Sequence, residues 1–205
     1  MARFSINYYS KPMESLIQKV LQNDRQACRK LYDQFSKAMY NICLRMLNSE
    51  EEALDALQDT FVLAFKNLSR LDEPAVFPAW IKKICVNVCL KQIKSRKKMN
   101  WSPLDEEPVL INLNDEDDIV DEVEYAGKLD AILEAVSLLP DKYRVVFTLF
   151  AIEDYSHDQI SEMLGIPNTT CRSQYMRAKQ KVIDIIKSNY HYGRSNEKIS
   201  SGSQI

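Results

Sequence analysis

The sequence predicts an all-α protein of two small helical domains joined by a flexible acidic linker, and three observations support this. Glycine is scarce, with 4 in 205 residues, while residues that favour helices are abundant. Apolar residues recur at helical spacing in several separate segments. Between residues 101 and 124 this spacing stops and acidic side chains dominate, as is typical of a linker. The 45% apolar content is enough to give both domains a core.

A first domain is expected over residues 13–100, after a tail of residues 1–12. It begins with a short helix near residues 13–21 and a long helix that follows the N-cap residue Asp24. Ser49 and Glu52 have the spacing of a capping box, which opens a third helix. The predicted inward stripe of that third helix is Leu54, Leu57, Phe61, Phe65 and Leu68.

A fourth helix, expected over residues 77–98, combines an apolar face with a cationic one. Pro74 and Pro78 mark its start. Between residues 82 and 98 there are seven basic residues and no acidic one. The side predicted to pack carries Phe77, Trp80, Ile81, Ile84 and Val88. The polar row on the neighbouring side is Lys83, Asn87, Lys91 and Lys94.

A second domain is expected over residues 125–190, with a disordered polar tail over residues 191–205. Its first helix should bury Leu129, Ile132, Leu133 and Val136. Pro140 starts the next helix, whose expected inward residues are Tyr143, Val146, Phe147 and Phe150.

The remainder of this domain predicts a helix-turn-helix. Ser156 and Gln159 form a second capping box, and Gly165 suits the left-handed position that ends a helix. Pro167 then disfavours helix at Ile166, and a new helix begins within three residues. The buried stripe of the new helix should be Cys171, Tyr175, Ala178, Val182 and Ile185. Side chains beside it are candidates for base contacts, namely Thr169, Thr170, Arg172, Ser173, Met176 and Arg177, with Lys179 and Lys181 placed for phosphate.

The charges are sorted along the chain, although the net charge is only −2. Ten acidic residues and no basic one lie between residues 105 and 124. Six basic residues accompany the single acid Asp184 between residues 172 and 194. Two cationic patches on amphipathic helices favour a polyanionic partner over a merely solvated surface.

Several function classes are disfavoured. The first residues lack the apolar run of a signal peptide and no stretch is apolar enough to span a bilayer, so we expect a cytoplasmic protein without membrane insertion. The five scattered cysteines have no zinc-ligand spacing, and we interpret them as reduced core residues in preference to a redox or metal switch at Cys85 and Cys89. No phosphate-binding glycine loop or catalytic set is recognisable, so neither enzymatic activity, a cofactor nor a metal is expected.

Two stretches of the sequence resemble a known family. DALQDTFVLAFKNLSRLD (residues 55–72) and FPAWIKKICVNVCLKQIKSRKK (residues 77–98) resemble domain 2 of extracytoplasmic-function (ECF) sigma factors of the sigma-70 family. LPDKYRVVFTLFAIEDYSHDQISEMLGIPNTTCRSQYMRAKQKV (residues 139–182) is similar to their domain 4. The two stretches occur in the family's order, without a long insertion between them.

The resemblance implies a transcription initiation factor, with promoter DNA and core RNA polymerase as partners. Asp55, Gln58 and Asp59 match residues that bind the clamp helices of the largest polymerase subunit. Domain 4 would also contact the flap of the second-largest subunit. The residues matching the grip on the melted minus-ten strand are Lys83, Asn87 and Lys91, with Lys94 continuing their row. The residues matching the minus-thirty-five reader are Thr169, Thr170, Arg172, Ser173 and Arg177, and we add Met176 and Lys179 from the same helix.

Other implied features concern the linker and the partners. The acidic linker matches a segment that threads the polymerase cleft, although a plain solubilising linker fits its composition equally well. An anti-sigma factor is expected from the family, and a monomer is expected when the protein is alone. Two alternatives remain open, a stand-alone helix-turn-helix regulator and a helical adaptor without DNA contact.

Three positions depart from the family pattern. Pro167 stands where a capping residue is usual, so Asn168 is expected to cap the second helix instead. Gln174 replaces a usual arginine, which would remove one cation from the DNA face. Ser161 replaces a usual alanine.

Overall fold

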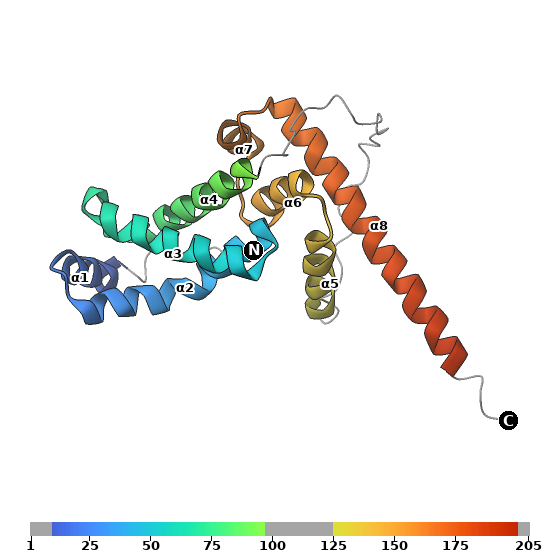
Figure 1. The fold of residues 1–205 in the computed structure, drawn as a ribbon, viewed down its shortest axis with the longest axis horizontal. Coiled ribbons are helices and arrows are strands. Elements are labelled where there is room, and N and C mark those ends of the chain that lie inside the picture. The colour runs from blue at the N-terminus through green and yellow to red at the C-terminus, as the bar shows by residue number, and fades with distance from the viewer. Residues whose placement is uncertain (1–9, 97–124, 201–205) are drawn as a thin grey trace. The chain divides into compact units, whose positions relative to one another are not determined.

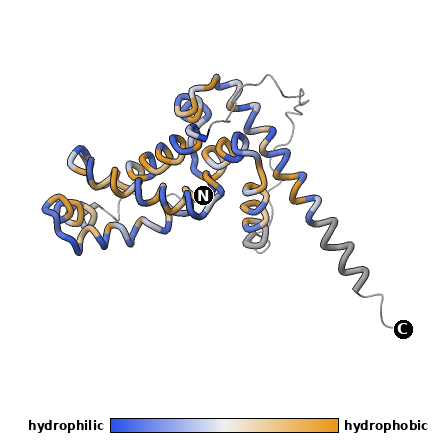
Figure 2. The backbone as a smooth tube through the Cα atoms, viewed as in Figure 1, coloured by the Kyte–Doolittle hydropathy of each residue, from blue (hydrophilic) through white to orange (hydrophobic). Residues whose placement is uncertain are grey.

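The computed structural model describes residues 10–96 and 125–200, with side chains over 12–96 and 129–189. The described residues are helical apart from turns and short connections, which confirms the predicted fold class. The chain divides into two compact units, the first ending at Lys97 and the second beginning at Lys98. The predicted linker, residues 101–124, lies outside the described residues. Most helices carry both apolar and polar residues along their length, as expected of amphipathic helices (Figure 2).

Three helices form the centre of the first unit. They are α2 (Arg25–Leu47), α3 (Glu50–Asn67) and α4 (Phe77–Ser95), and they pack side by side (Figure 1). The helix α1 (Ser10–Leu21) packs against α2 and the short turn η3 (Pro74–Val76), and η2 (Leu68–Arg70) follows α3. The helix α1 begins at Ser10, within residues 1–12, which the sequence predicts to be a tail. The largest fully buried side chains of this unit include Leu31, Met46, Leu47, Leu68, Phe77, Ile81 and Ile93.

Helix ends in the first unit are fixed by side chains. Asp24 accepts hydrogen bonds from the backbone N–H groups of Gln26 and Ala27, at 2.8 and 3.1 Å, which confirms it as an N-cap. Ser49 accepts from the N–H of Glu52 at 3.4 Å. The carboxylate of Glu52 forms an ion pair with Arg96, whose guanidinium also donates to the carbonyl of Leu47. Arg96 thereby joins the end of α2 and the start of α3 to the end of α4.

The predicted stripe of α3 is wrong at one position. Leu57, Phe61 and Leu68 are buried as expected, whereas Leu54 is 50% exposed. The inward face of α3 is built largely from small residues, namely Ala53, Ala56, Thr60 and Ala64. These residues let α2 and α4 approach closely, and they turn Leu54 away from the core.

The second unit is organised around one long helix. Its elements are α5 (Tyr125–Ser137), α6 (Asp141–Phe147) continued by the π-helical η5 (Thr148–Ile152), α7 (His157–Leu164) and α8 (Asn168–Ser200). The helix α8 contacts α5, α6 and α7. Arg144 is buried, donating to the carbonyl of Leu139 and pairing with Asp141. The core cluster is Ala135, Val136, Leu139, Tyr143, Phe147, Ala178 and Val182.

Two expectations for this unit need correction. Leu129 is 48% exposed, although helical spacing predicts it on the buried side of its helix. The predicted disordered tail begins too early, because α8 continues to Ser200. Polar residues with adequate helix propensity can extend a helix beyond the part that packs. Among the described residues, no helix is both long and apolar enough to cross a membrane.

Candidate functional sites

The helix-turn-helix has the predicted local geometry. Ser156 and Gln159 form the capping box at the start of α7, with both hydrogen bonds present at 3.2 and 2.9 Å. The helix ends at Gly165, whose φ of 71° is left-handed, and the Gly165 N–H donates to the Ser161 carbonyl. The Ser161 hydroxyl donates to the carbonyl of Ile166. Ser161, which replaces the usual alanine, therefore closes the turn.

The start of α8 differs from the expected cap. The carbonyl of Pro167 accepts the N–H of Cys171 at 3.0 Å, so Asn168 is already the first helical residue. Its side chain donates to Asp158 at the start of α7, at 2.5 Å. Asn168 therefore joins the beginnings of the two helices instead of capping the second one. Figure 1 shows α7 next to the start of α8.

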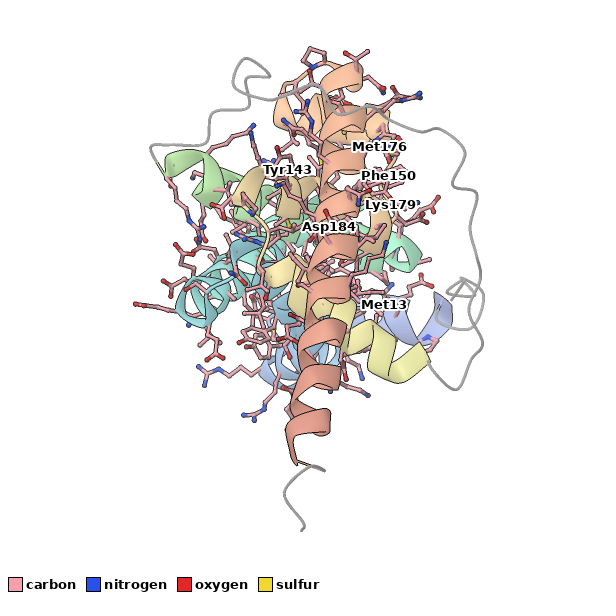
Figure 3. All side chains as sticks on the ribbon, turned by 90° about the vertical axis from the view of Figure 1, so that its right-hand side faces the viewer. Met13, Tyr143, Phe150, Met176, Lys179 and Asp184 are labelled. Atoms are coloured by element: carbon pink, nitrogen blue, oxygen red, sulfur yellow. The ribbon has the colours of Figure 1, made fainter. Side chains whose placement is uncertain are left out.

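One face of α8 gathers most of the predicted DNA-contacting side chains. On this face Thr169 and Arg172 are exposed, while Ser173, Met176, Arg177 and Lys179 are half-buried. Met176 and Lys179 follow one another along α8, with Asp184 further on (Figure 3). The residues of the face lie three or four positions apart along α8, which places them on neighbouring surfaces of one helix. The face consists of Thr169, Arg172, Ser173, Met176, Arg177 and Lys179.

Two side chains predicted for this face point inward. Thr170 is 9% exposed and Gln174 only 2%. They are four residues apart and, with Ala178, continue the buried side of α8. Thr170 is thus removed from the accessible face, and Gln174 does not occupy a cation position on it. Among the described residues, no group donates a hydrogen bond to the buried side-chain oxygen of Gln174.

An aromatic cluster that the sequence did not reveal holds α7 against α8. The imidazole of His157 stacks on Phe150 and lies near Tyr175, with ring centroids 4.0 and 5.6 Å away. Its Nδ1 is 3.5 Å from the Sγ of Cys171. Burial, and secondarily the charge of Arg172, lower the pKa of His157. Burial raises the pKa of the Cys171 thiol to about 11. Both groups are therefore neutral at pH 7.

The polar row of α4 lies on the surface, as predicted. Lys83, Asn87, Lys91 and Lys94 are all exposed. The other side of the helix packs through Phe77, Ile81 and Val88, while Trp80 and Ile84 are half-buried. Trp80 contacts Phe77, with ring centroids 5.9 Å apart, in keeping with its assignment to packing.

A second exposed face lies on α3. Asp55, Gln58 and Asp59 are exposed, and they lie between Leu54 and Val62, which are 50% and 63% exposed. Leu54, Gln58 and Val62 recur every four residues and so form one row. An acidic surface with two large exposed apolar side chains suits a protein partner better than a nucleic acid. The sequence does not reveal the apolar part of this face, because helical spacing predicts Leu54 in the core.

Comparison with known proteins identifies both units. The protein family described as "Sigma-70 region 2" matches residues 31–99, and the family described as "Sigma-70, region 4" matches residues 129–182. The ECF RNA polymerase sigma factor SigE of Mycolicibacterium smegmatis is 27% identical over 115 residues, which are 56% of this chain and 44% of that protein. The chain thus aligns with less than half of this relative.

Two solved complexes are among the structures similar to this chain. CnrH in complex with the cytosolic domain of CnrY gives a TM-score of 0.48 at 19% identity, covering 84% of this chain and 96% of that chain. The sigma factor RpoE in complex with the anti-sigma factor NepR, from Bartonella quintana, gives 0.49 at 16% identity, covering 78% and 96%. Since the regions 2 and 4 together match more than half of the sequence, in that order, the chain belongs to the ECF group of sigma-70 family RNA polymerase sigma factors.

Proposed function

We propose that this chain binds core RNA polymerase and directs it to promoters, acting stoichiometrically through binding energy. Sigma factors are transcription factors and not enzymes, in agreement with the expectation from the sequence. The observation that carries the proposal is that each unit exposes a cationic, hydrogen-bonding face on a helix whose other side is buried. Two such faces, one in each family region, fit two separate promoter elements.

Region 4 would read the duplex minus-thirty-five element with α8. The second helix of a helix-turn-helix enters the major groove with its N-terminal residues at the base edges. Arg172 and Arg177 can each donate two hydrogen bonds to guanine, and Met176 can contact a thymine methyl. Thr169 and Ser173 supply hydroxyls for bases or phosphates. Lys179 and Lys181 lie further along and suit phosphate. The burial of Thr170 leaves it a supporting role.

Region 2 would hold the melted minus-ten strand on α4. Separated DNA exposes both its phosphates and the edges of unstacked bases. Lys83, Lys91 and Lys94 provide a cationic track for the phosphates. Asn87, between two of these lysines, has an amide that can both donate to and accept from a base edge. Capture of an unpaired base in this way would stabilise the open complex.

The polymerase would bind region 2 through the α3 face. Asp55, Gln58 and Asp59 are proposed to contact the clamp helices of the largest subunit. The exposed Leu54 and Val62 add apolar area at the centre of the same surface, where interface energy is concentrated. Region 4 is proposed to contact the flap of the second-largest subunit.

Two further partners follow from family membership and charge. The acidic stretch at residues 105–124 is proposed to lie in the nucleic-acid channel of the polymerase, where its negative charge would resemble that of RNA. An anti-sigma factor is proposed as a regulator that masks the α3 and α8 faces. Alone, the protein is expected to be monomeric and cytoplasmic.

Run-off transcription tests the proposal. Sigma-free core polymerase is supplied with genomic fragments, with and without the protein. Protein-dependent start sites that share two spaced motifs are the expected result. Asn87→Ala should reduce promoter opening and Arg172→Ala should reduce duplex anchoring, whereas Arg29→Ala, on the exposed side of α2, should change neither.

The alternatives predict different outcomes. A stand-alone regulator would bind an operator without core polymerase and would make no protein-dependent start site. An adaptor would tolerate charge reversal at Arg172 and Lys94. Failure to bind core polymerase, after removal of any co-purifying protein, would contradict the sigma-factor proposal.

A further inference from the structure

Three of the five cysteines converge in the core of region 2. Cys43 comes from α2, while Cys85 and Cys89 lie one turn apart on α4. Their sulfur atoms all lie within 4.8 Å of one another, and Cys43 and Cys85 approach to 3.3 Å. All three side chains are fully buried. No promoter or polymerase contact proposed above uses them.

The spacing of the sulfur atoms fits a shared metal ion. A thiophilic ion bound about 2.3 Å from each of three sulfurs, in one plane, would hold them about 4.0 Å apart. The observed separations, from 3.3 Å to at most 4.8 Å, bracket that value. Small side-chain rotations therefore suffice to bring the three sulfurs to a common centre. Packing of small apolar residues does not require such convergence.

The surroundings of the cluster select the kind of ion. The polar groups next to Cys85 are the backbone carbonyl of Met39, at 3.5 Å, and the hydroxyl of Thr60, which already donates to the Ala56 carbonyl. Neither is a soft ligand. Structural zinc requires four ligands, and zinc with three protein ligands keeps a water, for which this fully buried cluster has no exposed position. Monovalent copper is soft and is satisfied by two or three thiolates.

We propose that Cys43, Cys85 and Cys89 form a thiolate site for Cu(I) in region 2. The ion arrives already reduced, so no electron is transferred. Each of the three thiols releases its proton to solvent as it becomes a ligand, so three thiolates around one Cu(I) leave two net negative charges in the core. The bound ion would tie α2 to α4, whose opposite side carries Lys83, Asn87 and Lys91.

A disulfide is the main rival chemistry. The 3.3 Å separation of Cys43 and Cys85 is far longer than the 2.05 Å of an S–S bond, and a reducing cytoplasm keeps thiols reduced. Oxidation of two thiols by hydrogen peroxide, giving the disulfide and two waters, would also need the oxidant to reach a fully buried pair. This rival is separated from the metal site by the thiol count in the experiment below.

The test is anaerobic titration of the reduced full-length chain with Cu(I) in competition with a chromophoric Cu(I) chelator. Because the cluster is buried, copper is added both to the folded protein and during refolding from urea. The expected result is one ion per chain, a thiolate-to-copper absorption band and a raised melting temperature. Cys43→Ala and Cys89→Ala should bind the ion more weakly than the wild type, because only two thiolates remain, while Cys28→Ala, outside the cluster, should bind it unchanged.

A weakened fold would also lower copper binding in a variant, so X-ray absorption of the loaded wild-type chain provides a second readout. Sulfur scatterers at about 2.3 Å, two or three per copper, support the site. Binding that persists when all three cysteines are replaced, or no binding above that of this triple variant, overturns it. Preferential binding of Zn(II) with an oxygen ligand overturns the assignment to Cu(I). A loss of two thiols in air, reversed by a reductant, would replace the metal site with a disulfide.

Discussion

The imidazole of His157 lies flat against the ring of Phe150, with centroids 4.0 Å apart and an angle of 7° between the planes. His157 is the first residue of α7, and Phe150 belongs to η5. The same imidazole approaches Cys171 of α8. One neutral ring thus connects three elements of the helix-turn-helix.

Region 4 should therefore lose stability in mild acid. Burial lowers the pKa of His157 in the folded chain below its usual value of about 6.5. As the pH falls below that value, the unfolded chain binds a proton that the folded chain still excludes, so folding becomes less favourable. Thermal unfolding between pH 7.5 and 5.5 should show this loss. His157→Gln should reduce this loss of stability, whereas His191→Gln should not. An equal dependence of the melting temperature on pH in the wild type and both variants would contradict the assignment.

Gly165 should tolerate asparagine better than alanine. A Cβ at this position meets nothing within 4 Å, but its φ of +71° is unfavourable for most side chains. Gly165→Ala should therefore destabilise region 4 by about 1 kcal/mol through backbone strain alone. Gly165→Asn should lose less stability than Gly165→Ala, since asparagine enters this conformation more readily. Urea unfolding measures the difference, and identical midpoints for the two variants would show that the turn relaxes.

Gln174 should behave as a core residue. Its side-chain oxygen is buried without a hydrogen-bond donor among the described residues. Gln174→Leu should stabilise the chain by about 1 kcal/mol, because it removes an unsatisfied polar group of similar size. Gln174→Arg should destabilise it instead of strengthening DNA binding. Stronger promoter binding by Gln174→Arg, with unchanged unfolding, would place this residue on the surface.

Leu54 should matter for polymerase binding and little for folding. Leu54→Ser removes an exposed side chain, so unfolding should change by no more than about 0.5 kcal/mol, while binding to core polymerase weakens. The buried neighbour Leu57 is the matched control, since Leu57→Ser should cost about 3 kcal/mol of stability. Urea unfolding measures the stability of the two variants, and competition against unlabelled wild-type protein measures their affinity for core polymerase. Wild-type affinity in Leu54→Ser would remove it from the interface.

Arg172 should contribute sequence-specific affinity and Lys179 salt-dependent affinity. Losing a bidentate contact from Arg172→Ala should cost about 2 kcal/mol, roughly 30-fold, on the preferred minus-thirty-five sequence. Lys179→Ala should weaken binding to all sequences alike. It should also lower the slope of the logarithm of the binding constant against the logarithm of the salt concentration by about 1. Holoenzyme binding to promoter fragments at several salt concentrations separates the two. Equal sequence preference in wild type and Arg172→Ala would argue against base contact.

Much of the fold was predictable because its determinants are local. Capping by Asp24 and Ser156, the left-handed Gly165 and the exposed row of α4 all follow from residue type and spacing. Features that depend on which neighbour packs where were not predictable. Leu54 and Gln174 were misplaced because helical spacing alone does not fix the width of a buried face.

The cysteine cluster shows the same limit more sharply. Cys85 and Cys89 share a helix face, and their spacing was visible in the sequence. Cys43 lies 42 residues before Cys85, and only the packing of α2 against α4 brings its sulfur to theirs. Scattered cysteines without ligand spacing can thus still meet in a helical bundle.

The turn between α7 and α8 bears on how region 4 folds. The bonds that shape it, from Ser156 to Gln159, Ser161 to Ile166 and Asn168 to Asp158, each join residues at most ten positions apart. Short loops close with little loss of chain entropy. We therefore expect this turn to form early and rapidly, with α5 and the C-terminal half of α8 joining it later. The helix-turn-helix of region 4 would then be its folding nucleus.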